Sequence, residues 1–310
     1  MSCISIVGSC KNEEENIAEL YKQINSIFAN SLKSHQLELI FIDNASSDNT
    51  IKIIKNICEN DKRVKLIENI KDYGQDKSPY YAIMQSSGDY VIPIVTDLQD
   101  PISVIPELVN YLSSDDDLDM VLAVPIIEKE GFNFLKKIYY KFMTLATDGS
   151  HIKNFHGFGI YRTKIIDYLR KLEDKNPYFR SIELNTNFSR KEINYKPDNR
   201  YRGTSKNSLF SLIDIGLLGI MTSSQLPLKF AVISGFTIAF LSMIASLGYL
   251  ILKIIYWDTF QIGLAPIVIG LFFLSSIQLI SIGIIAQYLS HQLAKDSNPP
   301  IVVEKNRINF

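Results

Sequence analysis

Residues 90–100 read YVIPIVTDLQD, and this stretch decides the fold that the sequence predicts. Its first half, residues 90–95, is an uncharged apolar run that is typical of a buried strand. Its second half turns polar at once, with Asp97, Gln99 and Asp100 close together. Ligands of open α/β sheets collect at the carboxyl ends of the strands. We therefore expect this polar turn to lie at a binding site.

The same alternation continues on both sides of this stretch. Apolar strand-like runs are separated by segments whose apolar residues recur at helical spacing. The predicted strands are residues 4–7, 37–42, 64–67, 90–95 and 120–124. The predicted helices are residues 17–28, 51–58, 81–86 and 105–112, with a helix-start signature of carboxylates from Asn12 onward. Regular strand-helix alternation predicts an α/β domain with a mostly parallel sheet.

Polar clusters follow three of the predicted strands, at residues 9–13, 43–44 and 97–100. Because the carboxyl ends of parallel strands meet at one edge of a sheet, we expect these clusters to converge there. Folding alone needs fewer polar residues than this at a single edge. The sequence therefore predicts a ligand site built from the three clusters.

Asp97, Gln99 and Asp100 are candidate metal ligands. Mg²⁺ and Mn²⁺ take oxygen ligands, and a nucleotide diphosphate supplies further oxygens. A metal held there would take up charge on a leaving nucleotide. The alternative is a polar strand end that caps a helix, with Pro101 in the first helical turn. Spacing alone favours neither interpretation.

Two further segments have a functional and a structural interpretation. Asp43, at the end of the second predicted strand, can accept hydrogen bonds from a ribose or base, or it can cap a turn. Residues 200–206 read RYRGTSK, a basic run in which arginine offers bidentate phosphate contacts and lysine offers a point charge. The alternative for this run is a juxtamembrane patch that is attracted to anionic lipid.

The C-terminal third predicts a membrane anchor. Residues 230–252 and 262–289 carry no formal charge, and each run exceeds the roughly 20 residues that cross a bilayer core as a helix. Two buried helices of a soluble protein are the alternative, which is disfavoured because such runs are hard to place in water. Residues 209–221 are apolar with one charge and predict a helix along the membrane surface.

Charge distribution sets the expected organisation. The net charge of -1 gives no support to a nucleic-acid binder. Lysine and arginine flank the two uncharged runs on their outer sides, which predicts that the N-terminal domain and the tail are cytoplasmic. The predicted parts are a cytoplasmic catalytic domain at 1–207, an interfacial juxtamembrane helix at 208–228, a two-helix transmembrane anchor at 229–289 and a cytoplasmic tail at 290–310.

Taken together, these residues resemble the family 2 polyprenyl-phosphate glycosyltransferases, which include dolichol-phosphate mannose synthase and the bacterial bactoprenol glucosyltransferases. The runs that match are residues 12–16, 42–50, 87–90, 97–101, 157–162, 177–180 and 200–207. They follow in family order and precede two predicted spans, so the resemblance covers nearly the whole chain. The DLQDP run and the basic run that contains Gly203 are the most specific.

The resemblance implies a fold, a reaction and a set of site residues. The fold would be GT-A, a Rossmann-like α/β domain, followed by two transmembrane helices. The reaction would be a metal-assisted, inverting transfer of a sugar from a nucleotide-sugar, with a UDP-sugar favoured, to polyprenyl phosphate such as undecaprenyl phosphate. The metal would be Mg²⁺ or Mn²⁺. The implied roles are metal binding for Asp97 and Gln99, catalysis for Asp97, Asp100, Arg200 and Lys206, and nucleotide binding for Ser9, Lys11, Asn12, Glu13, Asp43 and Asn44.

The resemblance also implies a location and partners. The protein would lie in the inner, cytoplasmic membrane as a multi-pass protein, in contact with membrane lipid, with the catalytic domain and both termini cytoplasmic. Its product would serve the modification of a surface polysaccharide or lipid. A homo-oligomer is a candidate assembly, and a flippase and a downstream glycosyltransferase are candidate partners in the same pathway.

Several residues depart from the family pattern, and they gather in the predicted site. Val95 stands where an aspartate is usual, Ala45 where a glycine is usual, and Asp72 where an asparagine is usual. Ser9 and Lys11 replace a proline and a tyrosine. We hypothesise that Lys11 supplies positive charge that a weakened metal site lacks. The alternative function is a non-catalytic relative that binds lipid phosphate or a partner and acts as a scaffold.

Overall fold

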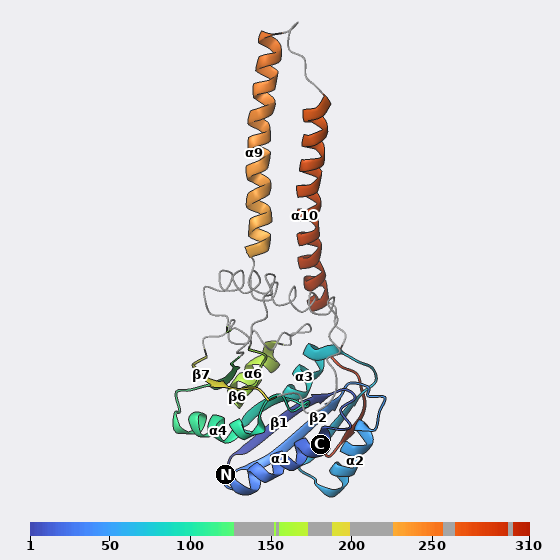
Figure 1. Ribbon diagram of the computed structural model, residues 1–310, viewed down its shortest axis with the longest axis vertical. Helices are drawn as coiled ribbons and strands as arrows, with labels where there is room; N and C mark the ends of the chain where they lie inside the picture. The colour runs from blue at the N-terminus through green and yellow to red at the C-terminus, as the bar shows by residue number, and fades with distance from the viewer. Residues whose placement is uncertain (127–151, 153–154, 173–187, 199–225, 257–263, 297–299) are drawn as a thin grey trace. The chain divides into compact units, whose positions relative to one another are not determined.

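The computed structural model describes residues 1–126, 152, 155–172, 188–198, 226–256, 264–296 and 300–310 (Figure 1). The chain forms two compact units. Unit 1 comprises Met1–Thr222 and Asn298–Phe310, and unit 2 comprises Ser223–Ser297. The predicted catalytic residues Arg200 and Lys206, and residues 208–225 of the predicted interfacial helix, lie outside the described residues.

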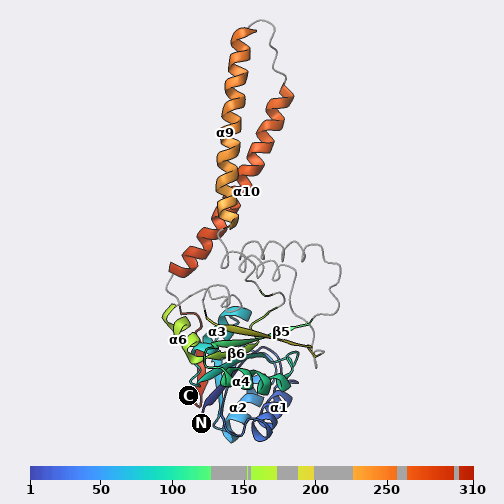
Figure 2. The ribbon, with the colours of Figure 1, turned by 90° about the vertical axis from the view of Figure 1, so that its left-hand side faces the viewer.

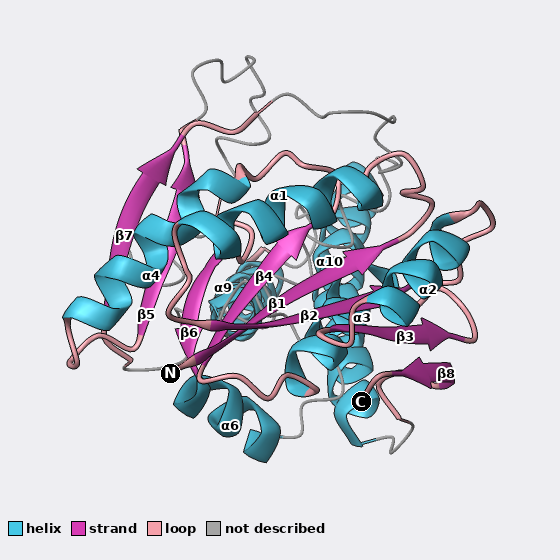
Figure 3. Cartoon of the chain, turned by 90° about the horizontal axis from the view of Figure 1, so that it is seen from below, coloured by secondary structure: helices cyan, strands magenta, loops and turns pink. Residues whose placement is uncertain are grey.

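A mixed eight-stranded sheet forms the centre of unit 1, in the order β7-β5-β6-β4-β1-β2-β3-β8 (Figure 3). The strands are β1 (Cys3–Cys10), β2 (Gln36–Asp43), β3 (Val64–Asn69), β4 (Tyr90–Val95), β5 (Met120–Pro125), β6 (Gly159–Arg162), β7 (Arg190–Tyr195) and β8 (Glu304–Ile308). The pairs β1–β2, β1–β4, β2–β3 and β5–β7 are parallel. The pairs β3–β8, β4–β6 and β5–β6 are antiparallel. The predicted α/β fold is confirmed, and the sheet is mixed, with four parallel and three antiparallel pairs among the described strands.

Helices cover both faces of this sheet (Figure 3). One face packs against α1 (Ile17–Asn30), α2 (Thr50–Asn60) and α4 (Ile105–Ser114), which follows the short 3₁₀ turn η1 (Ile102–Val104). The other face packs against α3 (Gly74–Met84) and α6 (Thr163–Leu172).

The core divides between the two faces because successive side chains of a strand point to opposite sides. In β2, Leu39 and Phe41 join one apolar cluster, and Ile40 and Ile42 join the other. Full burial of an aliphatic side chain of this size contributes about 1.5–3 kcal/mol. Apolar strands with both faces covered therefore supply most of the hydrophobic stabilisation of unit 1.

The strand register brings the ends of several strands to one edge. Cys10 of β1 lies opposite Asp43 of β2, and Asp43 lies opposite Glu68 of β3. On the other side, Pro125 of β5 lies opposite Tyr195 of β7. We call the loops at these ends, residues 10–16, 43–50, 69–74, 96–101 and 196–198, the carboxyl edge.

The helix-start signature at Asn12 and the predicted start of the helix at 81–86 are both wrong. The chain does not become helical at Asn12, which has a positive φ of 55°, and α1 starts at Ile17. The segment between them instead donates backbone hydrogen bonds to the loop after β2. In contrast, α3 starts at Gly74, earlier than predicted, where a φ of 84° suits glycine.

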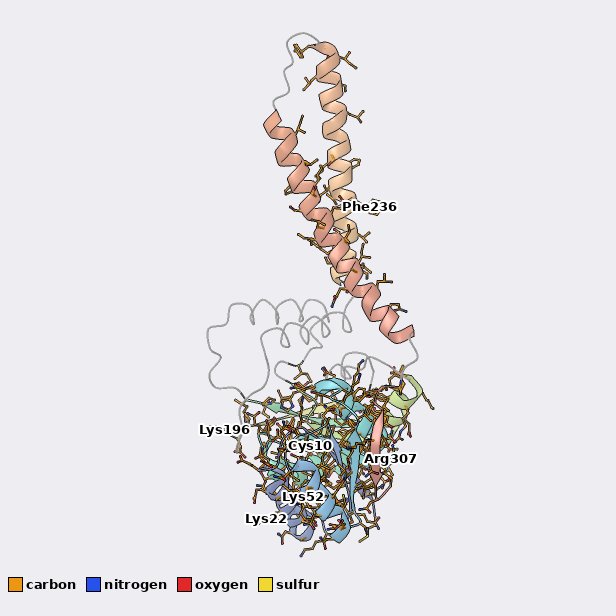
Figure 4. All side chains as sticks on the ribbon, turned by 90° about the vertical axis from the view of Figure 1, so that its right-hand side faces the viewer. Cys10, Lys22, Lys52, Lys196, Phe236 and Arg307 are labelled. Carbon is orange, nitrogen blue, oxygen red and sulfur yellow. The ribbon has the colours of Figure 1, made fainter. Side chains whose placement is uncertain are left out.

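The segment predicted as a tail, residues 290–310, contributes to both units. Its first part belongs to a helix of unit 2, and Glu304–Ile308 forms β8, which pairs with β3. Asn309 fastens the end of this strand, because its Nδ2 donates to the carbonyl oxygens of Cys58 and Val64, each at 2.8 Å. Figure 4 labels Arg307 on this strand. These residues are therefore an edge of the sheet, where a separate cytoplasmic tail was expected.

Unit 2 contains two long helices, α9 (Leu226–Ile255) and α10 (Leu264–Asp296), which lie side by side and run in opposite directions (Figures 1 and 2). Many of their apolar side chains are exposed, including Phe230 and Leu279. Phe236, which Figure 4 labels, is exposed as well. A search of the described residues finds no helix with the length and apolar character of a membrane span. The two-span anchor remains a prediction.

Candidate functional site

The loops after β1 and β2 are tied to each other by hydrogen bonds. The backbone N–H of Asn12 donates to Ser46 Oγ at 2.9 Å, and Asn12 Oδ1 accepts from the N–H of Ser47 at 2.8 Å. Next to it, the N–H of Glu13 donates to Thr50 Oγ1 at 2.8 Å. Asn12 and Glu13, two predicted nucleotide ligands, thus take part in the fold through these bonds.

Asp43 is completely buried at the end of β2. One carboxylate oxygen accepts from the N–H of Ser46 at 2.8 Å, and the other accepts from its hydroxyl at 2.5 Å. Burial raises the pKa of Asp43, and the two bonds from Ser46 oppose that rise. The turn-capping role that the sequence left open is therefore present in the structure.

Asn44 joins the loop after β2 to the loop after β3. Its Oδ1 accepts from Asn69 Nδ2 at 2.9 Å and from the N–H of Tyr73 at 3.1 Å, and its Nδ2 donates to the Gly74 oxygen at 3.0 Å. Asn44 is buried, so these bonds compensate for its removal from water. Its amide orients the backbone of two loops at the carboxyl edge.

Lys11 and Asp72, which both depart from the family pattern, form an ion pair. The pair links the end of β1 to the loop after β3, and both side chains are about 40% exposed (43% and 41%). Partial burial acts against ionisation, but the bonds from Lys11 and from the N–H of Gly74 lower the pKa of Asp72. The hypothesis that Lys11 compensates a weak metal site remains a prediction, and its ammonium group contacts Asp72.

The turn at 97–100 follows β4 and is unusual in its backbone. Leu98 has a φ of 62°, a left-handed conformation that is a genuine outlier for a bulky residue. Asp97 is buried, and its Oδ1 accepts from the N–H of Gln99 at 3.2 Å. Thr96 Oγ1 donates to the carbonyl oxygen of Ser9 at 3.0 Å, which ties the turn to β1.

Asp100 lies at the end of this turn and is almost fully buried. Its Oδ1 accepts from the Tyr195 hydroxyl at 2.5 Å and lies 3.1 Å from His156 Nε2. Burial and the neighbouring Asp100 charge raise the pKa of Tyr195 above its ordinary value, so the hydroxyl remains a donor.

His156 and Tyr195 were not singled out by the sequence. Tyr195 ends β7, a strand that we did not predict, and His156 precedes β6, another one. The alternation of exposed Glu192, buried Ile193, exposed Asn194 and buried Tyr195 is a strand pattern that would have located β7. No comparable signal marks His156.

The donor set at the turn suits a hard cation that arrives with a diphosphate. Among the described residues, no group of three or more His, Cys, Asp or Glu side chains is placed to hold a metal. Mg²⁺ is commonly held by one or two carboxylates together with substrate phosphates. Asp97 with the exposed amide of Gln99 fits that requirement, whereas Val95 adds an apolar side chain that is 40% exposed.

The basic run with Arg200 and Lys206 follows β7 in sequence and lies outside the described residues, which end at Asp198 in this part of the chain. The N–H of Asp198 donates to the carbonyl oxygen of Gln99 at 3.0 Å. The chain therefore contacts the turn at 97–100 two residues before Arg200. Figure 4 labels Lys196, which lies between this contact and Tyr195 in sequence.

Comparisons with known proteins agree on one family. The model described as "Glycosyl transferase family 2" matches residues 5–170. The bactoprenol glucosyl transferase of Shigella phage SfV is 26% identical over 306 residues, which cover 98% of this chain and 98% of the relative. The prophage bactoprenol glucosyl transferase homolog of Escherichia coli K12 is also 26% identical, over 97% of this chain and 98% of the relative.

Comparison with solved structures gives matches at low identity, one of which reaches a TM-score of 0.50. A mycobacterial protein has a TM-score of 0.50 at 19% identity, over 71% of this chain and 73% of that chain. The glucosyl-3-phosphoglycerate synthase of Mycobacterium tuberculosis, solved with Mn²⁺, UDP-glucose and phosphoglyceric acid, has a TM-score of 0.48 at 17% identity, over 71% of this chain and 78% of that chain. The shared architecture is a Rossmann-like, GT-A-like α/β sheet.

Proposed function

Since the chain belongs to glycosyl transferase family 2, we propose that it transfers a sugar from a nucleotide-sugar, with a UDP-sugar favoured, to polyprenyl phosphate. The single observation that carries this proposal is the similarity to bactoprenol glucosyl transferases along 97–98% of this chain and of the relatives. A match from end to end includes the region after the catalytic domain, where contact with a lipid acceptor is expected.

The residues at the carboxyl edge suit this chemistry. Asp97 and Gln99 would hold Mg²⁺ or Mn²⁺ together with the donor diphosphate, and the metal would supply charge neutralisation for the leaving group. A phosphate ester is largely ionised at pH 7, so the acceptor needs little help from a general base. Catalysis would then depend mainly on positioning and electrostatics, supplied by Asp97, Asp100, Arg200 and Lys206. The transfer would invert the configuration at the anomeric carbon.

We place the nucleotide at the loops after β1 to β3. Ser9, Lys11, Asn12, Glu13, Asp43 and Asn44 all belong to these loops or to the strand ends that carry them. Asp43 and Asn44 would shape this pocket mainly through the turns that they stabilise, because their side chains already bond within the protein. Lys11 offers a partly exposed positive charge for the diphosphate.

We further propose that unit 2 anchors the protein in the cytoplasmic membrane, with the catalytic unit and both termini in the cytoplasm. The uncharged residues 230–252 lie within α9, and many of the large apolar side chains described there are exposed, including Phe236, Phe240 and Ile244. β8 pairs with β3, so the chain that leaves unit 1 before α9 returns to it after α10. A chain that crosses a bilayer between those points must cross an even number of times, and two helices meet that requirement.

A donor screen tests the proposal. The full chain, purified in detergent with undecaprenyl phosphate and Mn²⁺ or Mg²⁺, is offered UDP- and GDP-sugars, and nucleotide release is followed. We expect metal-dependent release with one donor, a matching glycolipid, and a loss of about 100-fold or more in Asp97→Asn. Unchanged turnover in Asp97→Asn would remove Asp97 from the mechanism.

A second candidate function is a non-catalytic scaffold that binds lipid phosphate. The exposed Val95 at the end of β4, where an acidic metal ligand is usual in the family, favours it. Calorimetry separates the two functions. Binding of a nucleotide that depends on metal supports the transferase, and absence of nucleotide binding by folded protein supports the scaffold.

A further inference from the structure

The turn at 97–100 is contacted by two residues that are distant in sequence, His156 and Tyr195. Asp100 follows β4, His156 precedes β6, and Tyr195 ends β7. β6 runs antiparallel to β4 and β5, and β7 runs parallel to β5, so all three residues reach the carboxyl edge. The contacts among these three residues connect three segments of the sheet at the Asp100 carboxylate.

The contacts are of a kind that fixes geometry. A hydroxyl that donates to a carboxylate at 2.5 Å is a charge-assisted hydrogen bond, which is stronger than a neutral one. His156 Nε2 lies 3.1 Å from the same Asp100 oxygen and 3.1 Å from Tyr195 Oη. The Tyr195 ring meets the buried Phe158 edge to face at a centroid distance of 5.5 Å, which directs its hydroxyl toward Asp100.

The turn needs such support because its backbone is strained. A φ of 62° is unfavourable for leucine because its Cβ approaches the following carbonyl oxygen, and such conformations persist only where the surroundings over-determine them. Two ties from the β7 side reach the turn: Tyr195 to Asp100, and the N–H of Asp198 to the Gln99 oxygen at 3.0 Å. If these two hydrogen bonds are lost, we expect the backbone at Leu98 to leave its left-handed conformation more often.

We propose that Tyr195 and His156 are positioning residues, which hold Asp100 and thereby keep Asp97 and Gln99 in the arrangement that receives the donor. Neither residue needs to touch the substrate for this role. For its effect on the donor, the inference rests on the proposed function. The geometry of the turn itself is independent of that function and can be measured without any ligand.

Hydrogen–deuterium exchange of the full chain in detergent, without nucleotide, measures the turn directly. The amides of Gln99 and Asp198 report on it, since each donates a hydrogen bond there. In Tyr195→Phe and His156→Ala we expect both amides to exchange about tenfold faster than in the wild type. His156→Gln, whose side-chain amide can take the place of Nε2 beside Asp100 Oδ1 and Tyr195 Oη, should restore slower exchange.

Tyr80→Phe is the matched control. Tyr80 is also buried, and its hydroxyl donates to the Leu169 oxygen at 3.3 Å, between α3 and α6. It should lower the melting temperature about as much as Tyr195→Phe and leave exchange at Gln99 unchanged. Unchanged exchange at Gln99 in Tyr195→Phe overturns the proposal.

Donor binding then separates this inference from the proposed function. If the function holds, Tyr195→Phe raises the KM for the nucleotide-sugar about tenfold, and Tyr80→Phe does not. If the wild type binds no nucleotide-sugar while exchange at Gln99 still rises in Tyr195→Phe, the positioning role stands and the transferase function fails.

Discussion

Two buried carboxylates at opposite edges of the same sheet are satisfied in different ways. Glu38 lies near the amino end of β2 and is 5% exposed, while Asp100 lies at the carboxyl edge and is 2% exposed. Lys65 Nζ and Ser87 Oγ donate to Glu38 Oε1, each at 2.6 Å. Ser5 Oγ donates to Oε2. The N–H of Ser87 donates to the same oxygen at 2.8 Å. Both oxygens of Glu38 are therefore paired.

Only one carboxylate oxygen of Asp100, Oδ1, has a partner in the described part of the chain. Tyr195 and His156 both approach Oδ1, and Oδ2 is buried without a hydrogen-bond partner in the described part of the chain. Buried polar atoms are nearly always bonded, and a catalytic role is one of the recognised reasons for an exception. Both carboxylates are buried, and from this difference we expect Glu38 to stabilise the fold and Asp100 to serve the site.

Glu38→Gln should give the largest effect and tests the structural half of the comparison. The amide cannot accept two bonds on each side, and it leaves the partly buried Lys65 without its counter-charge. Breaking a buried pair costs about 3–5 kcal/mol, so we expect a loss of about 3 kcal/mol in thermal unfolding of the full chain. Glu59→Gln, an exposed control at the end of α2, should change stability by less than about 0.5 kcal/mol.

The pH dependence of this variant gives a second measurement. Burial acts to raise the pKa of Glu38, but the bonds from Lys65, Ser5 and Ser87 outweigh it and lower the pKa below its ordinary value of 4.5. A lowered carboxyl pKa contributes stability above the unfolded value and loses it as the pH falls toward the folded value. The difference in melting temperature between the wild type and Glu38→Gln should therefore shrink below about pH 4.5. A constant difference from pH 7 to 3 would contradict this assignment.

Asp100→Asn tests the functional half. The neutral amide is nearly the same size and can still accept at one oxygen, so we expect a stability change under about 1 kcal/mol. Loss of the charge at the carboxyl edge should lower turnover about 100-fold. Nucleotide release and thermal unfolding, measured on the same preparation, check both values. Wild-type turnover in Asp100→Asn would make Asp100 a second structural carboxylate and would end the contrast with Glu38.

The exposed pair at the carboxyl edge should give the smallest effect. Lys11→Ala breaks the bond to Asp72, and exposed ion pairs contribute about 0–1 kcal/mol, so stability should barely change. Donor affinity should fall about threefold if the ammonium attracts the diphosphate. Lys22→Ala removes a lysine from an exposed pair with Glu19 on α1 and is the matched control (Figure 4). Equal donor affinities in both variants would remove Lys11 from the nucleotide site.

The sequence predicted the parts of the fold whose pattern is local. Apolar runs located β1 to β5, because strands buried on both faces carry few polar residues. β7 and β8 are edge strands, and edge strands carry charges that hide the apolar pattern. Residues 304–308 read EKNRI, which gives no local sign of a strand. Only the unpaired edge of β3 explains why they form one.

The candidate site was predictable to a similar extent. Asp97 and Asp100 were predicted as site residues because they follow an apolar strand within a specific run, and that role stays a prediction. Asp43 and Asn44 were found as polar residues at a strand end, but their bonds to neighbouring loops depend on tertiary structure. His156 and Tyr195 reach Asp100 only because β6 and β7 join the sheet beside β5. Sequence pattern contains no information about that pairing.

The place of β8 in the chain has a consequence for biosynthesis. A ribosome makes β8 after both helices of unit 2, yet β8 covers the edge of a sheet whose other strands are made before them. Until β8 emerges, β3 exposes unpaired backbone groups that can recruit a strand from another chain. Translation that stops within unit 2 would therefore release a catalytic unit with an open edge, prone to aggregate. Complete synthesis of unit 2 is thus a condition for a finished catalytic sheet.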